Sequence, residues 1–423
     1  MQNIGEVFDG VDYAITFPAG LLYDAMGPST LLSVSCVAGL LGYVFLGMGL
    51  RSTNSLSSWW CSDSAFSLAF ALIGIAGQFA VCAGIVTSTK MFGKERAVTA
   101  IGAVQAAYGT SSAVFGAVFS ATGEDLVRTF TAWGLVVLAV YIVSLFAVRS
   151  HKTTSEPAGL SSRLLGDGAP DDDEHRIMAS LSATVEAGHP NDSRTLLENL
   201  CHVLTSGRFW LLYACFFIAT GNGLVVVNQL GGMVIATCDK SHYEKSCDQD
   251  SAKLSLLLVF SVIGPCTALS VGFLSDSLSI PRGTWVTMSL TVEAVMFLVA
   301  ALAFKDLWLL YPLVGFVTVA YSGMFCIARG LLIDFFGNAH FGSNQGLIFT
   351  AVAAGGATFN HIAASIVDSE TQAGDKFCLG PGCYKPIFWI GSASLGAAVM
   401  MSIVLIRCSI CPAQDPNLEP DHE

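Results

Sequence analysis

The sequence predicts an all-α polytopic membrane protein. Of its 423 residues, 53% are hydrophobic and 12% are charged, whereas soluble globular proteins carry roughly 25% charged residues. Eleven apolar segments lie along the chain, each near the length of about 20 residues that crosses the bilayer as a helix. This composition argues against a cytosolic enzyme. The net charge of −12 also argues against nucleic-acid binding, which needs basic residues to neutralise phosphates.

Five of the apolar segments precede a long polar stretch, and six follow it. The first five span 4–23, 30–50, 65–91, 98–120 and 129–148. The later six span 209–235, 254–275, 284–304, 307–333, 344–367 and 387–406. The first segment is the weakest, because Glu6, Asp9 and Asp12 occupy its opening turns and shorten its apolar part. Gly, Ala and Ser are frequent inside the segments, as close packing of helices in lipid requires.

The polar stretch between the two sets predicts a linker. Residues 149–207 carry nine acidic and five basic side chains, including the run Asp171 to Glu174. We expect this segment to be mostly disordered, with a short surface helix at 196–204. The predicted parts are an N-terminal bundle of five helices at 1–148, an acidic cytoplasmic linker at 149–207, a six-helix bundle at 208–407 and a cytoplasmic tail at 408–423.

The basic residues of the connecting loops favour a cytoplasmic linker. With this orientation, twelve of the 20 Lys and Arg residues lie on or near the cytoplasmic side and eight lie opposite. Cys238 and Cys247 then share one non-cytoplasmic loop, and Cys378 and Cys383 share another. Either pair can form a disulfide in an oxidising compartment, and free thiols are the alternative. A glycan at Asn191, which begins the one glycosylation sequon, would contradict this topology.

A short repeat marks the same end of the two halves. Gly20 and Asp24 close the first segment, and Gly272 and Asp276 close the second segment of the later half, with the same spacing of four. Parallel repeats of this kind are typical of transporters built from two similar halves. The glycine permits close approach of two backbones, and the aspartate can bind helix N-terminal amides or a nearby cation. These residues therefore predict an inner gate.

Four stretches of the sequence are similar to those of one known family. They are GLLYDAMGPST from Gly20, FWLLYACFFIATGNGLVVVNQLGG from Phe209, FFGNAHFGSNQG from Phe335 and FCLGPGCYKPIFW from Phe377. Together they resemble the major facilitator superfamily in its nodulin-like, monocarboxylate-transporter-like branch. The resemblance implies a two-bundle fold of twelve helices, alternating access and a central site between the bundles.

The chain departs from this family in two ways. The family carries basic residues near the aspartate of its first motif, whereas Ala25, Ser29 and Thr30 stand here, which puts a full charge relay at the inner gate in question. In addition, matching residues 20–28 to the loop after the family's second helix leaves no room for its first helix. We therefore expect 11 of the 12 family helices, with a truncated gene model as the favoured explanation.

Polar side chains inside apolar segments are costly unless they face the interior, so each is a candidate for the substrate pathway. In the first half these are Gln78, Gln105 and Tyr108. In the later half they are Asn222, Asn228, Gln229, Tyr321, Asn360 and His361. Asn222 lies between two glycines, which weaken the helix and can expose backbone groups to a ligand. For any single amide, a helix–helix hydrogen bond is the favoured alternative.

Three ionisable residues also lie inside apolar segments. Arg329 can pair with a carboxylate, but we expect its side chain to snorkel to the cytoplasmic surface. His361 can relay protons, and a packed histidine is the favoured alternative. Glu293 lies in the middle of its segment, where proton coupling competes with a structural pairing or a permanently protonated carboxyl. Glu293 and His361 are thus the candidates for ion coupling.

The residues and the resemblance together favour a secondary transporter of a small organic solute, with a monocarboxylate or an amino acid as the implied class. Its expected partners are the bilayer, that solute and a coupling proton or cation. We expect no cofactor and no metal site. The alternative is a non-transporting sensor or scaffold derived from a transporter fold. A membrane enzyme is disfavoured, because the sequence shows no Ser/His/Asp cluster at a membrane face.

Overall fold

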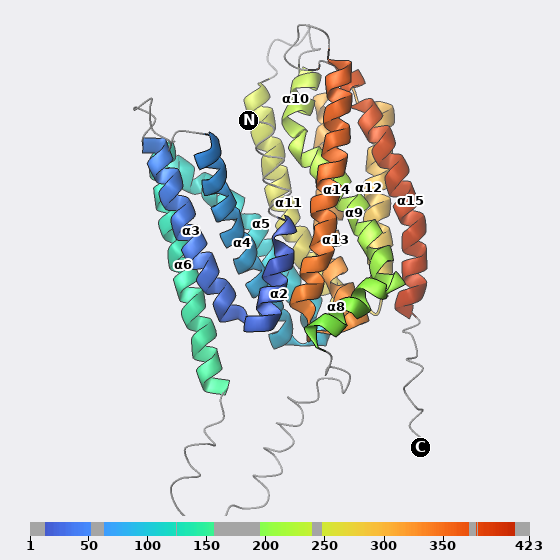
Figure 1. Ribbon diagram of the computed structural model, residues 1–423. Helices are drawn as coiled ribbons and strands as arrows, with labels where there is room; N and C mark the ends of the chain where they lie inside the picture. Colours follow the sequence, from blue (N-terminus) through green and yellow to red (C-terminus); the bar gives the residue numbers. More distant parts are fainter. Residues whose placement is uncertain are drawn as a thin grey trace, which may run out of the picture.

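A computed structural model describes residues 13–51, 63–123, 125–155, 195–238, 248–371, 378 and 380–410, and these residues form helices without a strand (Figure 1). The first group of helices is α2 (Thr16–Met26), α3 (Pro28–Arg51), α4 (Asp63–Phe92), α5 (Ala97–Ala121) and α6 (Leu126–Ser155). The second group is α8 (Leu196–Thr205), α9 (Gly207–Asn228), α10 (Leu230–Cys238), α11 (Gln249–Ser277), α12 (Arg282–Ala303), α13 (Leu310–Phe336), α14 (Phe341–Glu370) and α15 (Lys385–Ile410). Three short 3-10 turns, η3 (Lys94–Arg96), η5 (Leu307–Leu309) and η6 (Pro381–Cys383), complete the described elements.

The long helices match the apolar segments of the sequence. Nine of the described helices are long and apolar enough to cross a membrane. The other two predicted segments correspond to α5, which has 25 residues, and to α2, which has 11 residues and is too short to span the hydrocarbon by itself. The start of that first segment, including Glu6, Asp9 and Asp12, lies outside the described residues.

One predicted segment is broken in two. The segment at 209–235 was expected to be continuous, but α9 ends at Asn228 and α10 begins at Leu230, with Gln229 between them. Gly231 and Gly232 follow the break, and glycine is a poor helix former. The hydroxyl of Tyr384 occupies the position that a Cβ at Gly232 would take, so the absence of a side chain at Gly232 makes room for Tyr384.

The helices form two bundles that face each other. In Figure 1, α3, α4 and α6 lie on one side and α9, α12 and α15 on the other, with α2, α5, α11 and α14 between them. Two pairs join the bundles, since α2 packs on α14 and α5 packs on α11. A Cβ at Gly20 would overlap the carbonyl oxygen of Gly342, and one at Gly272 would lie 2.7 Å from the carbonyl oxygen of Val98. Glycine therefore permits both close contacts.

The two ends of the molecule differ. At one end, which we call the α8 end, α2 stops at Met26, and Gly27, with φ of 82°, turns the chain into α3 at Pro28. Glycine favours this positive φ and proline the first turn of a helix. The surface helix predicted at 196–204 is present here as α8, with a capping box between Thr195 and Glu198. At the opposite end, Cys378 and Cys383 form a disulfide.

The predicted linker is only partly described. Its first residues continue α6 as far as Ser155, and its last residues form α8. Residues 156–194, including Asn191 and the acidic run from Asp171, lie outside the described residues, as does the tail from residue 411.

Candidate functional site

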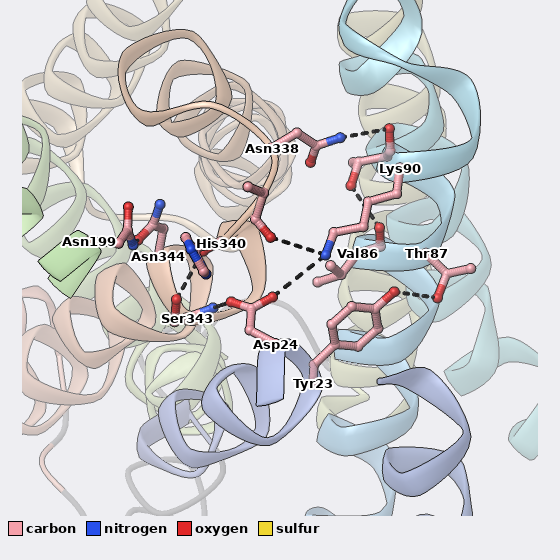
Figure 2. Close-up of polar contacts among 12 residues, drawn as sticks. Tyr23, Asp24, Val86, Thr87, Lys90, Asn199, Asn338, His340, Ser343 and Asn344 are labelled. Carbon is pink, nitrogen blue, oxygen red and sulfur yellow. Dashed lines mark hydrogen bonds and ion pairs between the residues drawn. The ribbon is translucent and has the colours of Figure 1, made fainter. Parts of the chain in front are cut away.

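Asp24 joins α2 to the N-terminus of α14. Its Oδ2 accepts a hydrogen bond of 2.6 Å from the backbone N–H of Ser343, and Ser343 is the third residue of α14. Figure 2 shows the carboxylate pointing from α2 toward Ser343 on one side and Lys90 on the other. The first N–H groups of a helix have no partner within the helix and carry the positive end of its dipole. Asp24 therefore caps a helix of the opposite bundle.

A lysine from a third helix completes this contact. Lys90 lies in the last turn of α4, with its Nζ 3.7 Å from Asp24 Oδ1, and it also donates to the carbonyl oxygen of Ala339 at 3.2 Å. Asn338 donates to the carbonyl oxygen of Thr89 at 3.1 Å (Figure 2). These bonds tie the end of α4 to the loop before α14. Lys90 thus supplies the cation that is missing around Ala25, Ser29 and Thr30.

Asp276 makes the corresponding contact in the other direction. It closes α11, and its Oδ2 accepts hydrogen bonds from both the backbone N–H and the hydroxyl of Thr99, at 2.7 and 2.8 Å. Thr99 is the third residue of α5. Arg282 Nη2 lies 2.9 Å from Asp276 Oδ1, and its Nη1 lies 2.6 Å from Asp334. A cavity of about 990 Å³ opens beside this cluster, so water reaches its edge.

The two contacts are equivalent by position. In each, the aspartate four residues after the close-contact glycine accepts the amide of the third residue of a helix in the opposite bundle. Both lie at the α8 end. We call the group around Asp24, Lys90 and Ser343 the Asp24 gate, and the group around Asp276, Arg282 and Thr99 the Asp276 gate. Each holds the bundles together by a charge-assisted hydrogen bond to a helix N-terminus.

A buried arginine lies behind these gates. Arg329 of α13 is 2% exposed, so the prediction that it snorkels to the surface is wrong. Its helix continues for seven more residues to Phe336 and is covered by α5 and α14. Its Nη1 donates to Gln105 Oε1 of α5 at 2.8 Å, and its guanidinium lies 4.5 Å from the ring centroid of Phe349. Gln105 and Arg329 thus join the two bundles.

Aromatic side chains lie next to this pair. The hydroxyls of Tyr13 and Tyr321 are 3.3 Å apart and connect the start of the chain to α13. Phe325 packs between them and Phe349, with centroids 4.7 Å from Tyr321 and 5.4 Å from Phe349. Tyr108, one turn after Gln105 in α5, is 42% exposed. Gln105 thus contacts Arg329 directly, and Tyr321 is linked to it through the Phe325 ring.

The other predicted pathway residues lie apart from Arg329. Gln78 of α4 is buried and accepts from Thr16 at 3.5 Å. Asn222 donates to Ser394 of α15 at 3.2 Å, so its side chain faces away from the other bundle. Asn228 and Gln229 lie at the break between α9 and α10, and Gln229 is buried.

The candidates for ion coupling do not lie together. Glu293 of α12 is 1% exposed, and its Oε1 has no hydrogen-bond partner among the described residues. Asn360 of α14 is buried and donates to the carbonyl oxygen of Gly356, whereas the next residue, His361, is exposed.

Of the other predicted disulfide, Cys238 is disulfide-bonded, and Cys247 lies outside the described residues. No group of three or more His, Cys, Asp or Glu that could hold a metal ion occurs among the residues that the structure describes.

Comparison with known proteins decides the family. The family model described as Major Facilitator Superfamily matches residues 12–359. The chain belongs to the Major Facilitator Superfamily. It is therefore a multi-pass membrane protein of a transporter family and not an enzyme.

Relatives and solved structures agree with this family. "Probable transporter MCH1" of Saccharomyces cerevisiae is 22% identical over 410 residues, which is 91% of this chain and 80% of the relative. The protein of the same name from Wickerhamomyces anomalus is 24% identical over 388 residues, which is 87% of this chain and 72% of the relative.

Three solved transporters show the same superfamily fold. The E. coli fucose:proton symporter FucP has a TM-score of 0.62 and 10% identity, and the match covers 95% of this chain and 90% of FucP. The proton:xylose symporter XylE has a TM-score of 0.64 and 12% identity, and the match covers 95% of this chain and 85% of XylE. The human organic anion transporter MFSD10 has a TM-score of 0.59 and 14% identity, and the match covers 95% of this chain and 83% of MFSD10. At these identities the likeness shows the fold alone.

Proposed function

We propose that the protein is an alternating-access secondary transporter whose two bundles separate at the Asp24 and Asp276 gates. The observation that carries this proposal is the equivalence of the gates: each bundle caps one helix of the other, with the same spacing and at the same end of the molecule. Two matched polar contacts can open together when the bundles rock, because each is confined to helix ends on the same side of the molecule. Alternating access in carriers of this kind is largely such a rocking motion.

The α8 end is assigned to the cytoplasm in this proposal. Lys90, Lys94, Arg96 and Arg282 all lie at this end, and basic residues are concentrated in cytoplasmic loops. The acidic linker and the tail are then cytoplasmic. The disulfide of Cys378 and Cys383 is then non-cytoplasmic, as its oxidised state requires.

The proposed substrate is a small organic solute, with a monocarboxylate or an amino acid as the leading class. The nodulin-like, monocarboxylate-transporter-like resemblance supports this class, and relatives that carry the name "probable transporter" support transport itself. FucP and XylE are named as proton symporters, which supports a coupling proton. Glu293 and His361 are the proposed ion-coupling candidates, and the buried carboxyl of Glu293 is the stronger of the two.

We also propose that the exposed face of α5 packs against one further helix. Its counterpart α14 is covered by α9 and has 14 buried residues, whereas α5 exposes a face of small residues together with Tyr108 and Val114. Small residues on a helix face suit close packing of another helix in lipid.

Flux into proteoliposomes tests transport directly. Purified protein is reconstituted and assayed with labelled monocarboxylates and amino acids, with and without a proton gradient. Saturable uptake that exceeds protein-free vesicles supports the carrier. Solute binding without flux favours the alternative, a non-transporting sensor or scaffold that uses the acidic linker for partners.

A further inference from the structure

Arg329 is a buried cation without a counter-ion among the described residues. It is the one Lys or Arg below one-tenth exposure among the described residues, and no carboxylate of those residues lies within 4.0 Å of its nitrogens. Its Nε has no hydrogen-bond partner within the described part of the chain. By contrast, Arg282, also near the interface of the bundles, pairs with both Asp276 and Asp334. An ionised group deep in a membrane protein is costly and marks a functional site.

Neutral groups hold the guanidinium in the closed gate. Gln105 Oε1 accepts from Nη1 at 2.8 Å, and the rings of Phe349 and Phe325 lie 4.5 and 5.8 Å from the guanidinium carbon. The amide oxygen is a partial charge, and each ring offers the negative face of its quadrupole. These contacts orient the guanidinium, and no carboxylate of the described residues compensates its positive charge.

Gate opening removes the principal polar partner. Gln105 lies on α5, six residues after Thr99, which is held by Asp276, and Arg329 lies on α13 beside Gly330, which touches Arg282. The two residues therefore belong to opposite bundles, directly behind the Asp276 gate. When α5 leaves α13, the guanidinium loses Gln105 and faces the opened space. Its planar fork of donors matches a carboxylate better than any other side chain does.

We propose that Arg329 binds the carboxylate of the transported solute from the cytoplasmic side, and that Gln105 takes the place of this carboxylate when the inner gate closes. This inference rests on the proposed function only for the opening of the gate. It assigns the solute as a small organic anion, bound through its carboxylate at Arg329 with its apolar part against Phe349. The anion and the Gln105 amide compete for the same Nη1 donor, so release of the anion permits closure.

The test compares carboxylates with their uncharged amides. Thermal unfolding of the full-length protein in detergent is measured with acetate, lactate or pyruvate, and with acetamide or lactamide at the same ionic strength. Anything that binds only the folded state raises the unfolding temperature. We expect a rise with at least one carboxylate and none with its amide. We expect Arg329→Gln to abolish this rise, because a neutral amide replaces the cation and can still pair with Gln105.

Variants of Gln105 separate competition from simple loss of structure. Gln105→Glu is nearly isosteric and supplies an internal carboxylate, so it raises the unfolding temperature without ligand and abolishes the response to carboxylates. Gln105→Ala removes the competitor, so the carboxylate response persists with tighter apparent affinity. Should Gln105→Glu fail to fold, the opposite effects of Gln105→Ala and Arg329→Gln still test the competition.

Several results would overturn the proposal. They are a wild-type protein that does not distinguish carboxylates from amides, an Arg329→Gln variant that responds like the wild type, or a Gln105→Ala variant that loses the response. Binding does not depend on transport, so the two proposals can fail separately. Carboxylate binding without flux contradicts transport and leaves the Arg329 site in place. A flux that is unchanged in the Arg329→Gln variant contradicts the carboxylate site at Arg329 and leaves the proposed transport in place.

Discussion

The two gates have the same design but use their carboxylates to different extents. Asp276 uses both oxygens, since Oδ2 accepts two hydrogen bonds from Thr99 and Oδ1 lies 2.9 Å from Arg282. Asp24 uses Oδ2 for the Ser343 amide, but its Oδ1 has no hydrogen-bond partner among the described residues. Its cation, Lys90, is 3.7 Å away and 37% exposed. Contacts to an exposed charge are weaker and more strongly screened.

This difference shows that equivalent sequence motifs do not give equivalent strength. The repeat fixes where each aspartate lies, and the surrounding helix ends determine what else it binds. In the Asp276 gate the carboxylate accepts from the amide and the hydroxyl of Thr99 in α5 and also lies beside the Arg282 guanidinium. In the Asp24 gate the carboxylate has one short hydrogen bond, from the Ser343 amide. We therefore expect the contact between α2 and α14 to yield first when the inner gate opens.

The largest expected effect comes from adding volume where α2 meets α14. Gly20→Val would place a side chain against the carbonyl of Gly342, where backbone atoms cannot move aside. Overpacking usually costs about 1–3 kcal/mol and occasionally more. At Gly20 the added atoms meet fixed backbone, so we expect a cost above this range, and it acts on the closed gate. Cys82 is buried in α4 two turns before Lys90 and reports on opening. A membrane-impermeant maleimide applied from the α8 side should label it much faster, as read by mass spectrometry.

A matched control identifies the cause of faster labelling. Gly396→Val in α15, a helix outside both gates, meets no atom within 4 Å of its Cβ, and its labelling of Cys82 should equal that of the wild type. Equal labelling of Gly20→Val and Gly396→Val would show that the close approach of α2 and α14 does not close the pathway.

The next effect is expected at the stronger gate. Asp276→Asn removes the charge between Thr99 and Arg282, and breaking one partner of a buried ion pair costs about 3–5 kcal/mol. Asp334 keeps contact with Arg282, so the lower end of this range applies. Faster labelling of Cys82 from the α8 side is the expected outcome. Asp306→Asn, an exposed site outside both gates, is the control and should change nothing.

A smaller effect is expected at the weaker gate. Asp24→Asn keeps an acceptor for the Ser343 amide and loses only the charge, which is worth about 1 kcal/mol at a helix N-terminus. Labelling of Cys82 should therefore rise less than in Asp276→Asn. Because Lys90 is partly exposed, added salt should reduce the difference between Asp24→Asn and the wild type. An effect of Asp24→Asn that equals or exceeds that of Asp276→Asn would reverse the assigned order of the gates.

The sequence predicted the positions of the two gate aspartates better than it predicted the residues that bind them. The spacing of Gly20 from Asp24 and of Gly272 from Asp276 located both helix ends, because a local repeat depends only on the chain itself. Lys90, Arg282 and Thr99 were not proposed as gate residues, because distant helix ends meet only through tertiary packing. The order of the segments still predicted the fold class, which the family and the solved structures confirm.

Arg329 shows why a local estimate of depth fails. The apolar segment was expected to end at 333, which left about one turn beyond the arginine. In the structure α13 continues to Phe336, and side chains of α5 and α14 cover the guanidinium. Burial is a property of the neighbouring helices, so no pattern within α13 could reveal it. The contact of Tyr384 with Gly232 could not be predicted for a similar reason, since the two residues meet only through tertiary packing.

The smallest expected effect concerns the support behind the weaker gate. Asn199 of α8 is 4% exposed and donates to Asn344 Oδ1 at 2.8 Å (Figure 2). Asn344 follows Ser343, whose amide Asp24 accepts. Asn199→Ala leaves the buried Asn344 carbonyl without this donor, at a cost of about 1 kcal/mol. The first turn of α14 should then hold Asp24 less firmly, and labelling of Cys82 should rise slightly.

A double-mutant cycle decides whether Asn199 acts through the gate. Asn199→Ala should have little further effect in an Asp24→Asn background, because the bond it supports is already weakened, whereas its effect should be undiminished with Asp276→Asn. Sites that share a contact are non-additive, and independent sites add. Leu197→Ala, at a side chain that is 71% exposed on the same helix, controls for changes in α8 itself. Additivity with Asp24→Asn would show that α8 merely covers the end of α14, so that the two gates differ only in the groups that touch their carboxylates.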